Sequence, residues 1–246
     1  MLKTYLIAGA NRGIGLDLVK EILQTETNQV FATVRNVDNV ADLKAIGSDK
    51  LHIVQCDISS EDSIDECFEQ INKLTNSIDV AILSAALMEG DFKGPMELTE
   101  SRESWNEFKT NSIQAFGVNA LSQIYLANKV IPLIEASNEK KLIFVSTGLA
   151  SLDYTRRAKV AGNVSYSLSK VALSLLAAKY GAQLKPKGVT VLAICPGMVN
   201  SRNLTQEQVD MIFGPAIEST RKFNPDFVGV LTCEDACKKF LKAVEF

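Results

Sequence analysis

Short continuous runs of apolar residues alternate along the chain with longer stretches in which apolar residues recur at helical spacing. The short runs predict strands at 4–10, 29–35, 51–57, 79–85, 141–147 and 189–195. The helical spacing predicts helices at about 14–24, 40–46, 59–74, 105–135, 164–184 and 233–244. Strands and helices that alternate in this way are typical of a parallel sheet covered by helices on both faces.

The predicted fold class is therefore α/β, with a single Rossmann-type domain over residues 1–246 and a doubly wound parallel sheet of about seven strands. The seventh would be a short strand near 227–231. Residues 200–227 show no clear strand pattern and mix phenylalanine with glycine and proline, so we expect an irregular segment that covers the carboxyl edge of the sheet. Open sheets of this kind bind their ligands at that edge.

The charge of the chain is nearly balanced, with 29 acidic and 26 basic residues and a net charge of −3. This balance gives no reason to expect a nucleic-acid partner or an anionic membrane surface. The longest apolar runs, such as 80–88, are too short to cross a bilayer, and the first strand begins too early to leave room for a signal peptide. We therefore expect a cytoplasmic protein.

Five cysteines and one histidine are spread along the chain without the spacing of a disulfide framework or a metal site. Cys233 and Cys237 are one helical turn apart, but the only histidine, His52, lies in a predicted strand far along the chain. Reduced cysteines are the ordinary state in the cytosol, so we expect no metal and no disulfide.

Tyr166 and Lys170 lie four residues apart in the helix predicted at 164–184, and therefore on one face of it. A tyrosine with a pKa of roughly 10 is a weak acid or base at neutral pH. A neighbouring ammonium favours the phenolate and is expected to lower that pKa toward the working range. Ser146 and Thr147 end the preceding strand, at the edge where ligands bind. The pattern predicts proton transfer at this edge.

The turn after the first strand carries glycines at 9, 13 and 15 and opens a helix. Gly9 permits a tight turn, Gly13 lets the backbone approach a pyrophosphate, and Gly15 lets the helix pack against the strand. The amino terminus of that helix favours the phosphate charge. The turn therefore predicts a dinucleotide site.

The second strand ends without the carboxylate that would bind a free ribose 2′-hydroxyl. Arg35 stands at that position or one residue beyond it, and Arg12 lies within the glycine turn. Two guanidinium groups suit a 2′-phosphate by charge and by geometry. We therefore predict NADP(H) as the cofactor, with two solvated surface arginines as the alternative.

The glycine turn, followed about 150 residues later by Tyr166 and Lys170, resembles the short-chain dehydrogenase/reductase family and looks most like its small carbonyl reductases. The resemblance covers essentially the whole chain and implies an oxidoreductase that passes a hydride from NADPH to a small aldehyde or ketone. In this reading Tyr166 is the proton donor, Lys170 binds the nicotinamide ribose and lowers the pKa of the tyrosine, and Asn119 positions a water in a proton relay.

The same resemblance implies which residues hold the cofactor. Asp57 ends the third strand, where the family contacts the adenine, and Val199 and Ser201 follow the sixth strand near the nicotinamide and the phosphates. The whole set expected at the cofactor is Gly9, Asn11, Arg12, Gly13, Ile14, Gly15, Arg35, Asp57, Ile58, Ser84, Ala85, Tyr166, Lys170, Pro196, Gly197, Val199 and Ser201.

Two positions depart from the family pattern. The family usually has two serines where this chain has Ser146 and Thr147; alignment gives the catalytic hydroxyl to Thr147 and leaves Ser146 as the alternative. The family's Asn-Asn-Ala-Gly motif is replaced by Leu-Ser-Ala-Ala at 83–86, so an asparagine that ties the central strands is lost. The second departure affects the geometry of the backbone beside the nicotinamide. It removes no proton donor.

The remaining expectations concern the substrate, the assembly and rival functions. Apolar residues such as Leu152 and Met211 are expected to line a cleft for a small-molecule carbonyl or alcohol substrate. Small residues on the helices at 105–135 and 164–184 suit the helix pairing by which the family often dimerises, so a homodimer or homotetramer is expected; packing within the monomer is the alternative. The rival functions are a regulator that binds NADP(H) without turnover and a lyase or epimerase on a related fold.

Overall fold

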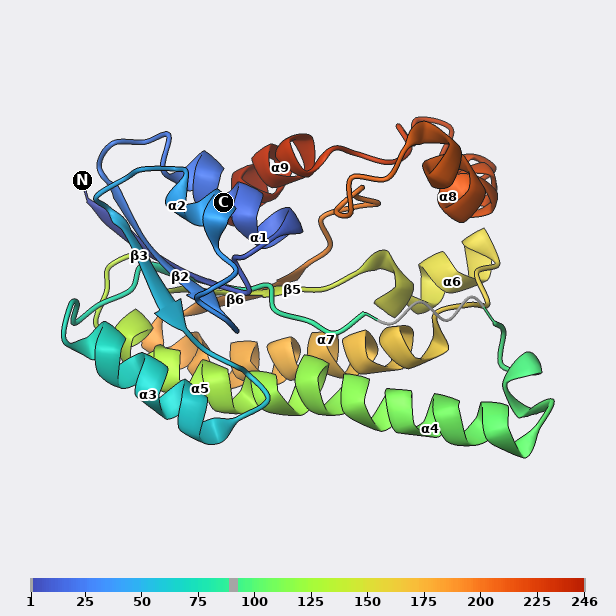
Figure 1. Cartoon of the computed structure of the whole chain (residues 1–246), viewed down its shortest axis with the longest axis horizontal. Helices are drawn as coiled ribbons and strands as arrows, with labels where there is room; N and C mark the ends of the chain where they lie inside the picture. Colours follow the sequence, from blue (N-terminus) through green and yellow to red (C-terminus); the bar gives the residue numbers. More distant parts are fainter. Residues whose placement is uncertain (1, 89–92, 246) are drawn as a thin grey trace.

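The computed structural model describes residues 2–88 and 93–245 (Figure 1). Within these residues the sheet has six strands, all parallel, in the order β3-β2-β1-β4-β5-β6. This is the doubly wound Rossmann order, with its switch point between β1 and β4. The strands are β1 (Lys3–Ala8), β2 (Asn28–Val34), β3 (Leu51–Gln55), β4 (Val80–Leu83), β5 (Lys141–Val145) and β6 (Thr190–Ile194).

Helices cover both faces of this sheet (Figure 1). One face packs against α3 (Glu61–Asn72), α5 (Ser122–Glu135) and α7 (Val164–Leu184). The other packs against α1 (Gly13–Ile22), α2 (Ala41–Lys44) and α9 (Cys233–Glu245). Leu6 and Ala8 of β1 point to the first layer, whereas Ile7 points to the second. Because both faces are buried, the strands are continuous apolar runs rather than alternating ones.

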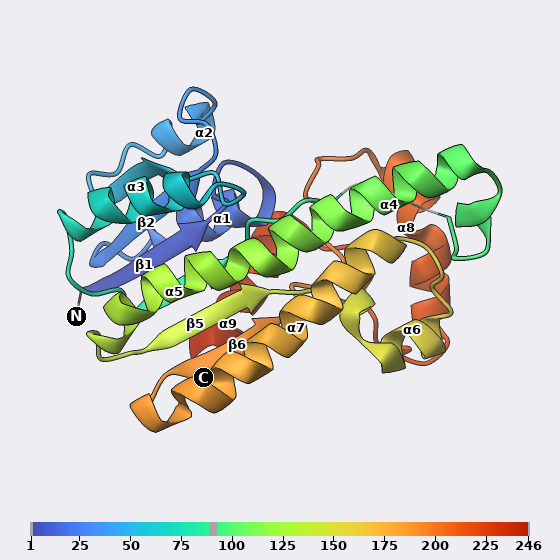
Figure 2. The ribbon, with the colours of Figure 1, turned by 90° about the horizontal axis from the view of Figure 1, so that it is seen from below.

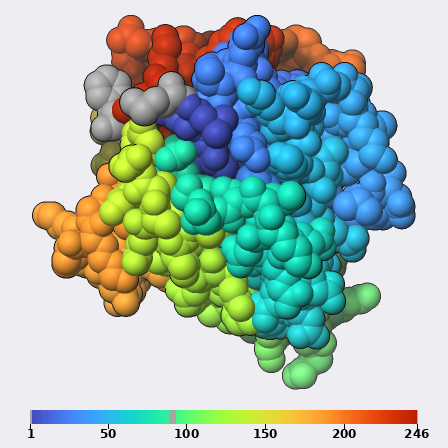
Figure 3. Space-filling view, turned by 90° about the vertical axis from the view of Figure 1, so that its left-hand side faces the viewer, coloured from blue at the N-terminus to red at the C-terminus, as the bar shows by residue number. Residues whose placement is uncertain are grey.

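The stretch predicted as one helix at 105–135 is a single rod with a defect in its middle. It consists of α4 (Arg102–Phe116), a π-helical turn at Gly117–Leu121, and α5, and it runs beside α7 (Figure 2). The rod begins where the hydroxyl of Ser101 accepts a hydrogen bond from the backbone N–H of Ser104. At its other end α5 lies against α3 on the surface (Figure 3).

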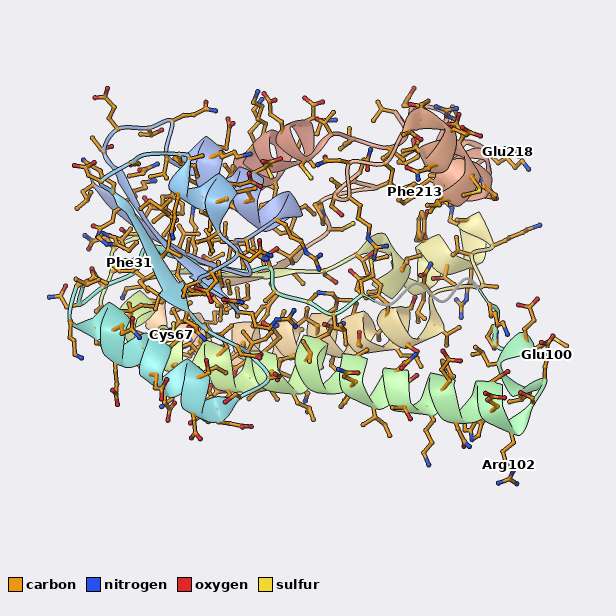
Figure 4. The ribbon with its side chains drawn as sticks, viewed as in Figure 1. Phe31, Cys67, Glu100, Arg102, Phe213 and Glu218 are labelled. Atoms are coloured by element: carbon orange, nitrogen blue, oxygen red, sulfur yellow. The ribbon has the colours of Figure 1, made fainter. Side chains whose placement is uncertain are left out.

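The interior and the periphery are clearly separated in the side-chain view. Phe31 and Cys67 lie buried between the sheet and α3, whereas Glu100, Arg102 and Glu218 lie exposed at the outside of the molecule (Figure 4). No helix in the described part of the chain combines the length and the apolar character that a membrane span requires.

Two sequence expectations about the carboxyl-terminal part are wrong. The stretch near 227–231 forms no strand in the described residues; it is reduced to one isolated parallel bridge between Val199 and Leu231. The segment 200–227 is not irregular, because it contains α8 (Gln206–Arg221). The hydroxyl of Thr205 and the side chain of Gln208 form a reciprocal capping box that starts this helix.

Two further short elements complete the carboxyl edge. The loop before the tyrosine helix, expected without regular structure, contains a 3₁₀ turn at Gly148–Ala150 and α6 (Leu152–Ala158). Helix α6 packs against α8 at the end of the molecule where α7 begins (Figure 1). A 3₁₀ turn at Glu97–Thr99 precedes α4, and another at Lys185–Lys187 follows α7.

Candidate active site

Tyr166 and Lys170 lie in the first two turns of α7, beside the end of β5. Lys170 is 2% exposed, and its ammonium Nζ donates a hydrogen bond of 2.8 Å to the backbone carbonyl of Val145. The same Nζ lies 5.8 Å from the centre of the Tyr166 ring. The tyrosine is half-buried. The helix therefore brings a phenol and a buried ammonium together at the carboxyl edge of the sheet, as their spacing predicts.

The expected lowering of the tyrosine pKa is wrong for the protein alone. Burial, with a smaller contribution from Cys195, raises the pKa of Tyr166 to about 12. Burial also lowers the pKa of Lys170 to about 8. Both shifts have one cause: a low-dielectric site disfavours the charged form of either group. Tyr166 is consequently a protonated phenol throughout the physiological range.

The two hydroxyls at the end of β5 have different surroundings. Ser146 is buried, and its Oγ lies 2.8 Å from the Oγ of Ser174. Ser174 donates its proton to the backbone carbonyl of Lys170 at 2.9 Å, so the proton between the two serines belongs to Ser146. Thr147 is half-buried, and its Oγ1 accepts a hydrogen bond from the backbone N–H of Leu149 at 3.3 Å. Among the residues that the structure describes, the Thr147 hydroxyl has no acceptor for its proton, so that proton is available to donate.

Asn119 lies in the π-helical turn and is completely buried. Its amide brackets Leu87, accepting from the backbone N–H at 2.7 Å and donating to the carbonyl at 2.8 Å. It also donates to the hydroxyl of Ser169 at 3.0 Å, and Ser169 donates to the backbone carbonyl of Tyr166 at 2.8 Å. Asn119 thus ties the loop after β4 to the turn of α7 that carries the tyrosine. Its side chain makes no direct hydrogen bond to Lys170 within the described residues.

The glycine turn has the shape of a phosphate cradle. Gly9 and Gly13 have positive φ angles of 82° and 55°. A Cβ on Gly9 would lie 2.7 Å from the Cα of Ala85, and a Cβ on Gly15 would collide with the carbonyl oxygen of Gly9. Only glycine fits these positions, so the turn and the start of α1 are built for close backbone approach. These residues fit the pyrophosphate of a dinucleotide.

The residues around this turn are placed as follows. Asn11 is half-buried and Arg12 is exposed at the start of α1. The carbonyl of Ile14 accepts a hydrogen bond from the thiol of Cys237 at 3.4 Å, which fixes α9 under the turn. Ser201 reaches the turn from the segment after β6, since a Cβ on Gly13 would lie 3.2 Å from the Cβ of Ser201.

Arg35 directly follows β2, and Asp57 lies two residues beyond the end of the adjacent strand β3. Burial raises the pKa of Asp57, but hydrogen bonds from Ser59 and the charge of Arg35 outweigh it and leave the pKa below its usual range. Arg35 is exposed, as Arg12 is, and neither guanidinium forms a salt bridge within the described residues, although the charge of Arg35 acts on Asp57. Ile58 lies buried in the core.

The loop after β4, where the family asparagine is absent, is held by hydrogen bonds to β1 and to the rod. Leu83 is buried in the core, and the backbone N–H of Ser84 donates to the carbonyl of Ala8 at 3.0 Å. The carbonyl of Ala85 accepts a hydrogen bond of 3.0 Å from Nε2 of Gln123, which is 1% exposed. A buried helix amide, which the sequence analysis did not single out, therefore holds the backbone of this loop.

The segment after β6 runs across the same edge. Gly197 has a φ of 95°, which turns the chain after Pro196. The bridge between Val199 and Leu231 then lays the segment alongside the stretch before α9. Ser201, two residues after Val199, lies against the glycine turn. The glycine turn, the loop after β4 and the segment after β6, which all carry predicted cofactor residues, thus meet at one edge of the sheet.

The apolar residues predicted to line a substrate cleft are only partly placed there. Leu152 is 68% exposed and Met211 is 73% exposed, so neither is enclosed. Phe213 lies on a different side of α8 from Glu218 and is half-buried (Figure 4). A hydrogen bond joins α6 to α8 instead. It links the half-buried Tyr154 of α6 with the buried Thr220 of α8.

Comparison with known proteins agrees with this geometry. A family model described as short chain dehydrogenase matches residues 3–211. The chain belongs to the short-chain dehydrogenase/reductase family. It is therefore an oxidoreductase of a family that uses a nicotinamide cofactor. The sequence prediction of this family is confirmed.

Individual relatives of this dehydrogenase cover nearly all of it. It is 30% identical to the short-chain dehydrogenase/reductase atnB of an Arthrinium species, over 99% of this chain and 92% of that protein. Among solved structures, the carbonyl reductase Sniffer of D. melanogaster gives a TM-score of 0.78 at 20% identity, covering 99% of this chain and 92% of that one. NADPH-bound carbonyl reductase from chicken fatty liver gives 0.77 at 17% identity, covering 99% and 87%. The two structures share the fold.

Proposed function

We propose that this dehydrogenase is an NADPH-dependent reductase that converts the carbonyl group of a small aldehyde or ketone to an alcohol. The observation that carries the proposal is the protonated, half-buried phenol of Tyr166 beside the buried ammonium of Lys170. A phenol that keeps its proton at neutral pH is in the right state to give it to a carbonyl oxygen. The resting protonation state of Tyr166 therefore suits the reductive half of the reaction.

Each residue of the site then has a task. NADPH, when bound, supplies the hydride for the carbonyl carbon. Tyr166 transfers its proton to the carbonyl oxygen, so that one hydride and one proton convert C=O to CH–OH. Thr147 donates its free proton as a hydrogen bond to the same oxygen, where negative charge develops. The positive charge of Lys170 offsets the charge left on Tyr166. Asn119 is proposed to order a water behind the lysine and to hold α7 in place.

The preference for NADPH rests on Arg12 and Arg35, which leave two exposed guanidinium groups beside the glycine turn and the end of β2. A ribose 2′-phosphate is the ligand that such a pair suits. The bound NADPH of the chicken carbonyl reductase supports the same choice for a chain of this fold. Asp57, Ser84, Ala85, Pro196, Gly197 and Val199 are proposed to line the remainder of the cofactor site.

The substrate is proposed to lie between Tyr166 and the segment 200–227, which covers the site as part of the single domain 1–246. Apolar side chains on α6 and α8 favour an apolar or aromatic substrate body. Three cations, Arg156 and Arg157 of α6 and Lys159 just after it, are proposed as a solvated basic face rather than as an anion site; Arg156 and Lys159 are exposed, and Arg157 pairs with Asp153 at 3.4 Å.

A homodimer or homotetramer is proposed through the rod and α7. Their outer surfaces carry exposed apolar side chains in helical succession, which water-exposed faces of monomers rarely do. On the rod these side chains are Ile113, Phe116, Leu121 and Ile124, and on α7 they are Leu168, Val171 and Leu175.

The experiment that tests the function is NADPH oxidation against a panel of aldehydes and ketones, followed by loss of NADPH absorbance. Tyr166→Phe is the deciding variant: turnover should fall by about 10²–10⁴-fold, while NADPH affinity measured by calorimetry stays within about twofold. Turnover that survives in Tyr166→Phe contradicts the proposed proton donor. NADPH binding without turnover on any carbonyl would favour the rival function of a regulator that senses NADP(H).

A further inference from the structure

Tyr154 connects the segment that covers the site to the loop that carries the strand-end hydroxyl. Its ring carbons lie 3.8 and 3.9 Å from the position of a Cβ on Gly148, the residue after Thr147. Its hydroxyl lies 3.1 Å from Oγ1 of Thr220 on α8. The ring thus faces the space beside Gly148 in the active-site loop, and the hydroxyl bonds the covering helix; α6, which carries Tyr154, packs against α8 at the carboxyl end of the sheet (Figure 1).

The direction of this hydrogen bond is fixed by its neighbour. Thr220 is buried and donates its only hydroxyl proton to the backbone carbonyl of Ala216 at 2.6 Å. Tyr154 must therefore be the donor to Thr220. Among the residues that the structure describes, this is the only side-chain hydrogen bond that joins α8 to another helix or to a strand.

A smaller aromatic contact supports the same junction. Phe223, just after α8, meets the Tyr154 ring edge to face with centres 6.2 Å apart. The guanidinium of Arg157 lies 4.6 Å from the centre of the Phe223 ring. Phe223 is half-buried and Arg157 is exposed, so these contacts add to the junction without replacing the hydrogen bond of Tyr154 to Thr220.

We propose that Tyr154 is a positioning residue, which latches α8 over the substrate site and transmits that closure to the Gly148–Thr147 loop. The inference rests on the proposed function and deepens it. It separates two tasks within one side chain: the hydroxyl holds the covering helix, and the ring supports the loop of the catalytic hydroxyl. Substrate retention therefore depends on the hydroxyl, and the chemical step depends on the ring.

The kinetic test compares three variants at the latch. Tyr154→Phe removes only the bond between the two side chains, whereas Thr220→Val also removes the bond of Thr220 to Ala216; in each, KM for the carbonyl substrate should rise about two- to tenfold, with kcat and KM for NADPH unchanged. The double variant should resemble Thr220→Val, because the bond that Tyr154→Phe removes is already absent there. Tyr154→Ala also removes the ring and should lower kcat. Tyr125→Phe is the matched control. The hydroxyl of Tyr125 in α5 bonds Asp65 of α3, and Tyr125→Phe removes that bond.

A second readout is independent of turnover. Amide hydrogen exchange within 206–221 should accelerate about two- to tenfold in Tyr154→Phe and Thr220→Val, while exchange within 61–72 stays unchanged. Unchanged exchange in α8 overturns the latch, as does a substrate KM that rises equally in Tyr125→Phe. Faster exchange in α8 of a protein that turns over no carbonyl would uphold the latch and refute the proposed function.

Discussion

The hydroxyl oxygens of Ser146 and Ser174 lie 2.8 Å apart, and Ser174 gives its own proton to the backbone of Lys170. The proton of Ser146 is therefore used in the hydrogen bond to Ser174 and is not available to a substrate. Thr147, the next residue, uses its oxygen as an acceptor and keeps its proton. Ser146 and Thr147, the two candidates for the catalytic hydroxyl, therefore differ in one respect: Thr147 can donate its proton to a substrate, whereas Ser146 donates its proton to Ser174.

We expect Thr147→Val to lower kcat about 10²–10³-fold, because it removes a donor aimed at the developing negative charge. Thr147→Ser should retain most activity. Ser146→Ala should change kcat by less than about threefold but lower the free energy of unfolding by about 1 kcal/mol, the value of a lost buried hydrogen bond. Steady-state kinetics and urea denaturation measure the two effects. The reverse ranking of Ser146→Ala and Thr147→Val would give the catalytic role to Ser146.

The lowered pKa of Lys170 predicts an alkaline limit to activity. The ammonium is needed when Tyr166 gives up its proton, and it is lost as the pH rises through about 8. For the free enzyme, kcat/KM should therefore fall tenfold per pH unit above about 8. Lys170→Met should be slow at every pH and lack this limb. A flat profile up to pH 10 in the unmodified enzyme would exclude the charge of Lys170 from the mechanism.

Lys170 should also link stability to pH. Its pKa is about 8 in the folded protein and 10.5 when exposed, so the unfolded chain binds more protons between these values and stability rises with pH across that window. The burial cost, about 3 kcal/mol, is fully present below pH 8. Lys170→Met removes it, so the stability advantage of that variant should shrink by about 3 kcal/mol between pH 8 and 10.5. Denaturation at both pH values tests this difference.

The arginine pair predicts the cofactor preference. Arg12→Ala and Arg35→Ala should each raise KM for NADPH about tenfold and leave KM for NADH within about twofold, because each removes a charged donor from the 2′-phosphate. Arg102→Ala, at the exposed start of α4, is the control (Figure 4). If NADH and NADPH are used equally by the unmodified protein, the two arginines are solvated surface residues and the preference is absent.

The sequence was most informative where burial leaves a pattern. Strands covered on both faces had to be continuous apolar runs, and this made the parallel sheet predictable. The tyrosine helix was predicted at 164–184 and is Val164–Leu184 in the structure, because Pro186 and Gly188 enforce its end. Helix α8 escaped prediction because Gly214 and Pro215 interrupt a stretch that the capping box at Thr205 nevertheless starts.

The site was less predictable, because its chemistry depends on burial and on partners far apart in the chain. The pKa of Tyr166 was expected to fall next to an ammonium, yet burial and the neighbouring Cys195 raise it. Gln123 and Ser174 look like ordinary polar helix residues until the fold turns them inward. The single available hint was that Gln123 follows Asn119 by four residues and so lies on the same face of the rod.

We expect Gln123 to affect the binding of NADPH although it does not line the proposed cofactor site. Its amide holds the carbonyl of Ala85, whose Cα lies directly against Gly9 in the phosphate turn. Gln123→Leu leaves that carbonyl unpaired and should raise KM for NADPH about tenfold while lowering stability by about 1–3 kcal/mol. Gln114→Leu, at an exposed position of α4, is the control. Equal loss of affinity for NADPH and for the carbonyl substrate would indicate general unfolding rather than a shifted turn.

The apolar stripe on the rod and α7 predicts an assembly. Leu121 and Leu175 are 53% and 59% exposed, and a carboxylate at either place would be buried without a partner at an interface formed by these helices. Leu121→Glu and Leu175→Glu should therefore convert the oligomer to a monomer by sedimentation velocity. Leu74→Glu, at a leucine of similar exposure (56%) after α3, should leave the mass unchanged. Two results would contradict this assembly: a monomeric unmodified protein, or an oligomer that both variants leave intact. In either case the small residues of these helices serve packing within one chain.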